Sequence, residues 1–153
     1  MGKFNLSIVS NGVNGLMEND MFGAFALPYV QMSTTQPEPK RTRVIVRLGT
    51  EYFVLSTLEV MMFYTVNKIV FCITSNAKKY IVEGTNLNQL LEELPSQLFF
   101  RANRQVIINI RFIQSFKPIG NGRIQINMQH DIFQPIQVSQ ENASEFRRWV
   151  GQL

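Results

Sequence analysis

Residues 99–113 read FFRANRQVIINIRFI, and this stretch decides the interpretation of the whole chain. Arg101, Arg104 and Arg111 stand there among apolar residues, and side-chain amides lie between them at Asn103, Gln105 and Asn109. The forked donors and acceptors of arginine and asparagine match base edges and phosphates. Arginines at strand edges are also common, so the stretch alone does not distinguish a nucleic-acid surface from a solvated strand.

A short helix and five strands are predicted upstream of this stretch. Four leucines recur at i, i+3, i+4 and i+7 within residues 86–94, Thr85 or Asn86 can cap them, and Pro95 ends the pattern. Before them, β-branched and aromatic segments alternate with turn residues, which is typical of hairpins. The predicted strands are Arg43–Leu48, Glu51–Ser56, Val60–Thr65, Lys68–Thr74 and Lys78–Glu83.

Downstream, the pattern predicts further short strands and a terminal helix. The strands are Val106–Ile108, Phe112–Phe116, Arg123–Met128 and Gln134–Val138, and Ser139 can cap a helix with an apolar stripe ending at Val150. Strands do not alternate with helices, so a doubly wound sheet is excluded. The predicted core is Val44, Val46, Phe53, Leu55, Met62, Val70, Ile81, Leu87, Leu91, Phe100, Ile108, Ile113, Ile124 and Ile126.

Composition excludes several classes of protein. The 153 residues are 45% hydrophobic and 17% charged, which fits one domain with a buried core. The lone Cys72 and the lone His130 exclude a disulfide framework and a cysteine-rich metal site. The chain lacks a glycine-rich phosphate loop and the common nucleophile and zinc motifs, so we expect no enzyme, no cofactor and no metal.

The charge and the prolines divide the chain near residue 40. Residues 1–40 hold two Lys/Arg against three Asp/Glu, a net −1, whereas residues 41–153 hold 13 against eight, a net +5. The sequence QPEPK at residues 36–40 predicts an extended linker. We therefore expect an N-terminal tail and linker over 1–40, with Phe22, Phe25 and Tyr29 able to dock, and a folded domain over 41–153.

No targeting or membrane-spanning segment is predicted. The longest apolar run, residues 21–30, contains Pro28 and is too short to cross a bilayer. The N-terminus has no basic region followed by an apolar core, so a secretory signal is not expected. These features predict a cytoplasmic protein without membrane contact.

Several segments, in colinear order, resemble the LytTR DNA-binding domain, the output module of bacterial LytT-type response regulators. They are Val60–Phe63, Lys78–Val82, Gly84–Leu87 with Leu90-Leu91, Phe100–Gln105, Ile108-Asn109, Ile113, Val138–Gln140 and the terminal helix. The resemblance covers about residues 41–153. Asn103 stands where the family usually has His, Gln105 where it has Ser, and Gln140 where it has Arg, so affinity or base preference should differ.

The resemblance implies a mostly β, elongated fold of short antiparallel sheets with one mid-chain helix and a C-terminal helix. It implies a transcription regulator of a two-component system that places loops in successive major grooves of double-stranded DNA and binds direct repeats, usually as a dimer. An upstream signalling partner is also implied. The implied DNA-contacting loops are Thr65–Lys68, Arg101–Gln105 and Ser139–Gln140, which supply Asn67, Lys68, Arg101, Asn103, Arg104, Gln105, Ser139 and Gln140.

The expected roles differ within these loops. Asn103 and Arg104 are expected at base edges, Lys68 at phosphate, and Arg101 at phosphate or as a brace of its loop. Asn109 is expected to make a turn or backbone hydrogen bond. Two alternatives remain open: the arginines could merely pair with Glu83, Glu92 or Glu93, and the domain could be a protein-interaction module that has lost DNA binding.

Overall fold

The structure is a computed structural model that describes residues 40–130 and 135–151. These residues belong to one compact unit, Pro39–Leu153. The expected tail and its docking residues Phe22, Phe25 and Tyr29 lie outside the described residues, as does the start of the last predicted strand. The domain boundary near residue 40 therefore stays a prediction.

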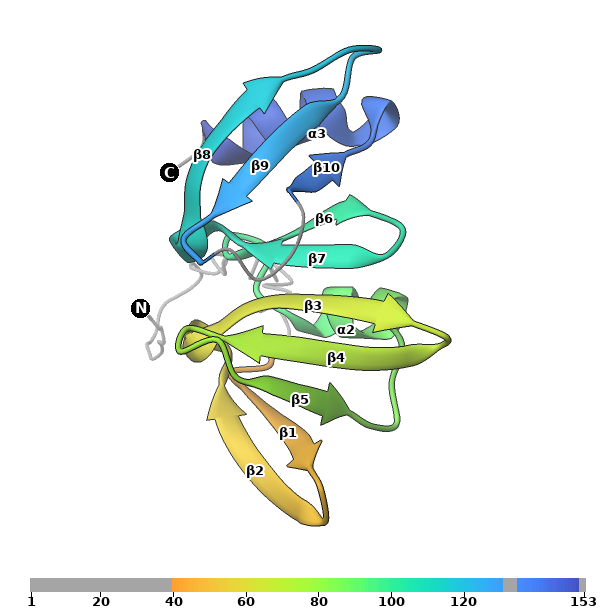
Figure 1. The fold of residues 1–153 in the computed structure, drawn as a ribbon, viewed down its shortest axis with the longest axis vertical. Coiled ribbons are helices and arrows are strands. Elements are labelled where there is room, and N and C mark those ends of the chain that lie inside the picture. The colour runs from red at the N-terminus through yellow and green to blue at the C-terminus, as the bar shows by residue number, and fades with distance from the viewer. Residues whose placement is uncertain (1–39, 131–134, 152–153) are drawn as a thin grey trace, which may run out of the picture. The chain divides into compact units, whose positions relative to one another are not determined.

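In the described residues, ten strands form two antiparallel sheets beside two α-helices, and the mostly β fold is confirmed (Figure 1). The seven-stranded sheet has the order β2-β1-β5-β4-β3-β7-β6, and the three-stranded sheet has the order β10-β9-β8. The strands of the first are β1 (Arg43–Leu48), β2 (Glu51–Ser56), β3 (Val60–Val66), β4 (Ile69–Thr74), β5 (Lys79–Val82), β6 (Phe99–Asn103) and β7 (Val106–Asn109). The second contains β8 (Ile113–Pro118), β9 (Ile124–Met128) and β10 (Ile136–Val138). The helices are α2 (Leu87–Glu93) and α3 (Gln140–Val150), with short 3-10 turns at η3 (Thr57–Glu59) and η4 (Ile110–Phe112).

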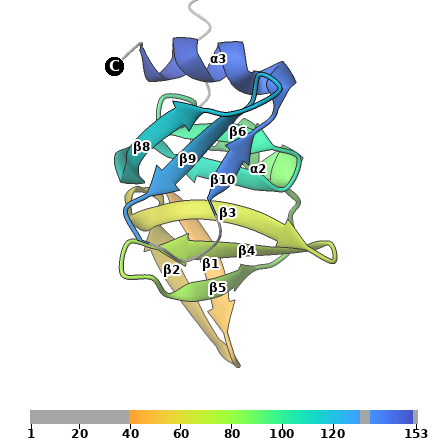
Figure 2. The same cartoon turned by 45° about the horizontal axis from the view of Figure 1, so that its top comes forward.

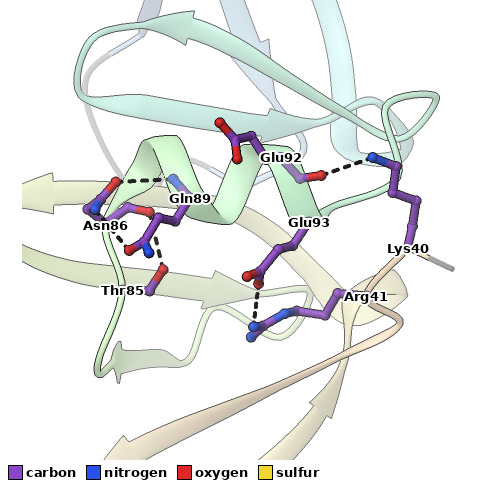
Figure 3. Close-up of polar contacts among 7 residues, drawn as sticks. All are labelled: Lys40, Arg41, Thr85, Asn86, Gln89, Glu92 and Glu93. Atoms are coloured by element: carbon purple, nitrogen blue, oxygen red, sulfur yellow. Dashed lines mark hydrogen bonds and ion pairs between the residues drawn. The ribbon is translucent and has the colours of Figure 1, made fainter. Parts of the chain in front are cut away.

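The helix α2 begins and ends with specific polar contacts (Figure 3). The Asn86 side-chain oxygen accepts hydrogen bonds from the backbone N–H groups of Asn88 and Gln89, as an N-cap does. At the other end, Lys40 Nζ donates to the Glu92 carbonyl over 2.9 Å, and Arg41 forms an ion pair with Glu93. Positive side chains suit the carbonyl end of a helix, so the start of the domain is fixed beside the end of α2.

The seven-stranded sheet separates two hydrophobic cores. Strand β3 is buried on both faces, because every residue from Val60 to Tyr64 is buried. One face packs against α2 through Leu87, Leu90 and Leu94. The other face, with Met62, Ile73 and Phe100, packs against the three-stranded sheet and α3 (Figure 2).

Most of the predicted core is buried, but the two-core arrangement corrects part of it. Phe53, Leu55, Ile81, Leu91 and Ile113 are half-buried. In β5 the neighbours of Ile81, Tyr80 and Val82, face the core instead, so the predicted phase of that strand was wrong. Leu90 in α2 and Leu94 directly after it are fully buried, and Leu91 packs at the margin.

Three single residues noted in the sequence have well-defined surroundings in the fold. Cys72 is buried, and His130 is exposed in a bend after β9. Asn109 is buried: its Nδ2 donates to the Val60 carbonyl over 2.8 Å, and its Oδ1 accepts from the Arg111 N–H over 3.0 Å. The structural role predicted for Asn109 is therefore confirmed. Neither of the described α-helices is long and apolar enough to cross a membrane.

Candidate nucleic-acid interface

The first predicted DNA-contacting loop is the tip of the β3–β4 hairpin. Val66 pairs with Ile69, so the loop consists of the two residues Asn67 and Lys68. Both have positive φ, 50° and 67°, which is the signature of a type I′ turn. Both side chains are exposed, and neither makes a hydrogen bond or ion pair within the described residues. The turn therefore presents one amide and one ammonium group to solvent.

The second loop is the tip of the β6–β7 hairpin, and Arg101 holds it in shape. The Arg101 guanidinium donates to the carbonyls of Asn103 over 2.7 Å and Arg104 over 2.6 Å, and to Asn88 Oδ1 on α2 over 2.7 Å. The strand is irregular here, because the pairing register shifts between Arg101 and Asn103. Three acceptors thus bind the guanidinium, and the bond to Asn88 connects the loop to α2.

Both polar groups of the Asn103 side chain are also engaged in hydrogen bonds within the domain. Its Nδ2 donates to the Gln137 carbonyl on β10 over 2.7 Å, and its Oδ1 accepts from the Gln105 N–H over 2.8 Å. Arg104 and Gln105, at the tip itself, are exposed. The Arg104 side chain makes no contact of this kind with the rest of the described chain, so its guanidinium is the free one of the loop.

The third site is the start of α3. Ser139 occupies the N-cap position in an extended conformation but makes no side-chain cap bond, and the residue is half-exposed. Gln140 is exposed and lies beside Gly122 at the tip of the β8–β9 hairpin, where a Cβ would come within 3.1 Å of the Gln140 Cγ. A hydroxyl and an amide are therefore presented at a helix N-terminus.

Backbone contacts bring the three sites together around the β6–β7 hairpin. The Thr65 N–H donates to the Gln105 carbonyl over 3.0 Å, which joins the first loop to the second. The Ser139 N–H donates to the Ala102 carbonyl over 3.2 Å, which joins the second loop to α3. A hollow of about 340 Å³ lies between the first two loops and β10, lined in part by Thr65, Asn103 and Gln137. The eight predicted residues thus belong to one continuous region.

The charges of this region are not neutralised by the carboxylates considered above. Glu83 pairs with Arg47 and Glu93 pairs with Arg41, whereas the side chain of Glu92 is exposed. Burial lowers the pKa of the Arg101 guanidinium, because desolvation disfavours its charged form. Arg101 remains a cation at neutral pH, and its charge is directed into the hairpin.

Four residues of this region were not predicted from the sequence. Asn88 and Asn142 belong to helices, and they contact Arg101 Nη1 and the Arg101 carbonyl, respectively. Arg123 and Gln137 form a hydrogen bond of 2.9 Å between the β8–β9 hairpin and β10. The turn signal Asn121-Gly122 marked a hairpin, but nothing local in the sequence placed its tip beside α3.

Comparisons with known proteins agree with this geometry. The family model for the LytTr DNA-binding domain matches residues 50–151. A solved structure of similar fold is the LytTr DNA-binding domain of a protein described as a methyl-accepting/DNA response regulator from Bacillus cereus. It has a TM-score of 0.64 and 22% identity, over 72% of this chain and 98% of that one. No curated protein matches the chain. The family match covers most of the sequence, and the chain therefore belongs to the LytTR DNA-binding domain family.

Proposed function

We propose that this domain is a sequence-specific regulator of transcription that places the tips of its three loops in the major groove of double-stranded DNA. The observation that carries the proposal is the gathering of Lys68, Arg104 and Gln140 at one region, each with an exposed side chain. Membership of a DNA-binding family supports the same conclusion. Direct-repeat sites, a dimer on DNA, an upstream signalling partner and a cytoplasmic location belong to the proposal as well.

The contacts within the hairpin divide the residues into two roles. Arg104 has a free guanidinium and is the proposed base-contacting residue, since arginine pairs with guanine in a bidentate manner. Lys68 and Asn67 form an exposed turn, and Lys68 is the proposed phosphate contact. Arg101 and Asn103 are positioning residues, because their polar groups already bind the backbone of the hairpin and of β10. Gln105, Ser139 and Gln140 complete the proposed DNA surface.

The experiment begins with selection of a site from random double-stranded DNA, because the target is unknown. Affinity for the selected site is then measured by fluorescence anisotropy at two salt concentrations with non-specific competitor. We expect binding that weakens with salt and survives the competitor. Two copies of the site in direct and in inverted orientation test the repeat arrangement. Failure to bind any DNA at low salt would favour the alternative, a protein-interaction module on this fold.

Two substitutions with matched controls test the residue roles. Arg104→Ala should cost about 1–3 kcal/mol of binding free energy and relax preference at one base pair. Its control is Arg111→Ala, an exposed arginine beyond the opposite end of β7.

Lys68→Ala should weaken binding to all sequences alike and lower the salt slope by about one. Its control is Lys78→Ala, an exposed lysine beyond the opposite end of β4. If Arg104→Ala and Lys68→Ala behave like their controls in a folded protein, the two loops do not contact DNA.

A further inference from the structure

The two edge strands of the seven-stranded sheet, β6 and β2, differ in how their backbones are covered. At one edge, β6 is covered, because its carbonyls at Arg101 and Ala102 accept hydrogen bonds from Asn142 Nδ2 and the Ser139 N–H. At the other edge, β2 pairs with β1 alone, and no described segment lies beyond it (Figure 1). Within the part of the chain that the structure describes, one side of the β2 backbone therefore has no partner strand.

Strand β2 carries none of the features that usually prevent edge-to-edge pairing. Its sequence, EYFVLS, has no proline and no lysine, and its register with β1 is continuous over six residue pairs without a bulge. Its one charge, Glu51, stands at the first position. Exposed edge strands in monomeric proteins are normally blocked by proline, lysine, bulges or inward charges. Strand β2 is thus an unblocked edge.

The side chains beside this edge are apolar on both faces. On the face away from α2, Ile45 pairs with Val54, and these two side chains are 62% and 65% exposed. Tyr52, on the same face, is 61% exposed. On the α2 face, Phe53 and Leu55 are half-buried at the margin of the core. A strand added here would cover apolar surface on both faces of the sheet.

We propose that β2 is a self-association edge, and that two copies of this chain pair antiparallel through it with Val54 opposite Val54. In this register Tyr52 lies opposite Ser56 and Phe53 opposite Leu55 of the second copy. A row of four β-branched side chains then crosses the seam, Ile45–Val54 followed by Val54–Ile45 of the second copy. Such cross-strand aliphatic contacts are the unit of sheet stabilisation.

A second copy of β2 is a compatible occupant, and the position of the strand's single carboxylate favours this register. No like charges face each other, because Glu51 is the strand's only charged side chain. In the neighbouring register, with Phe53 opposite Phe53, the Glu51 carboxylate would lie opposite Leu55 and lose hydration without a partner. The seam is narrow, so the pair is a weak, concentration-dependent dimer.

The pairing leaves the DNA surface of each copy free, but it orients the two surfaces in opposite directions. Strands β1, β5 and β4 separate β2 from β3, whose tip is the first DNA-contacting loop. A two-fold axis through Val54 turns one DNA surface by half a turn relative to the other. Direct repeats require the same orientation of both domains, so direct-repeat DNA would compete with this dimer.

Site-directed crosslinking of the full chain tests the register. Val54→Cys places two thiols opposite each other on the two-fold axis, within the Cα separation that a disulfide requires. The matched control is Ile45→Cys, which is about equally exposed. In the proposed pair, residue 45 of one copy lies three interstrand spacings, about 14 Å, from residue 45 of the other. The native Cys72 is buried, and desolvation raises its pKa to about 12, so it does not compete.

Under mild oxidation we expect Val54→Cys to form a disulfide-linked dimer at least about tenfold faster than Ile45→Cys. Equal rates would mean random collision and would overturn the register. Sedimentation across a concentration series gives an independent measurement without DNA. The native chain should rise above its monomer mass of 17.6 kDa, whereas Val54→Lys should remain monomeric.

The control for sedimentation is Ile69→Lys, which is 46% exposed on β4 and should associate like the native chain. Far-UV circular dichroism verifies that both variants are folded. A native chain that remains monomeric at every concentration refutes self-association. Because no DNA is present, this outcome leaves the proposed DNA binding untouched, and a failure to bind DNA leaves the dimer untouched.

Discussion

Replacement of Arg101 by alanine separates a brace of the hairpin from a phosphate contact. In the structure its guanidinium donates to two backbone carbonyls, those of Asn103 and Arg104, and to the side chain of Asn88. The first two bonds close the β6–β7 tip, and the third joins the tip to α2. Arg101→Ala should therefore destabilise the fold and disorder the loop that carries Arg104.

The expected magnitude follows from the three bonds. A hydrogen bond from a charged donor contributes about 1.5–3 kcal/mol, but Arg101 is partly exposed, and bonds that share one side chain are not additive. We expect Arg101→Ala to lower the free energy of unfolding by about 2–4 kcal/mol. Arg101→Lys keeps the charge but loses the forked geometry, so it should recover only part of this loss.

Urea unfolding measures the stability, and anisotropy with the selected DNA measures the salt slope. Asn88→Ala and the double variant complete a cycle that isolates the bond to α2. If Arg101 braces the hairpin, Arg101→Lys should lose DNA affinity while the salt slope of binding stays unchanged. If Arg101→Ala leaves stability intact, and Arg101→Lys keeps DNA affinity, then Arg101 is a phosphate contact and the bracing role is wrong.

Three further predictions concern the core, the thiol and the boundary of the domain. Leu90→Ala should cost about 2–5 kcal/mol of unfolding free energy in urea, and Leu91→Ala clearly less, because Leu90 is fully buried and Leu91 is not; equal losses would contradict this packing. Burial raises the pKa of Cys72 to about 12, so the folded protein should react with a thiol reagent at pH 8 only as fast as it unfolds, and rapid labelling in native buffer would disprove its burial. Deletion of residues 1–36 should leave a domain with cooperative thermal unfolding, and a truncated chain that fails to fold would show that the core begins before Arg41.

Local pattern determined much of this protein because hairpins and capped helices are set by neighbouring residues. The predicted limits of the first two strands are those of the structure, and Asn86 caps α2 as expected. Membership of the LytTR family was identified from short segments in the correct order, and the family model confirmed it. The predicted leucine stripe is the side of α2 that packs on the seven-stranded sheet.

Burial was predicted less well wherever a strand is covered on both faces. Val60–Tyr64 contains four consecutive apolar residues after Val60 and has no alternation to reveal which face is the core. The sequence pattern predicted only Met62 as a core residue there. Its neighbours are equally buried, Met61 in the same core as Met62 and Phe63 in the other core. The phase of β5 failed for a related reason, since Ile81 and its neighbours Tyr80 and Val82 are all apolar or aromatic.

The assembly of the candidate DNA surface was decided by the tertiary structure alone. The sequence supplied Lys68, Arg104 and Gln140 but could not show that their loops share hydrogen bonds, because those bonds join residues far apart in the chain. It also could not show that Arg101 and Asn103 are occupied, since their partners on α2 and β10 are set by packing. Short-range forces fix each hairpin, whereas which side chains remain free for DNA depends on how the hairpins pack together.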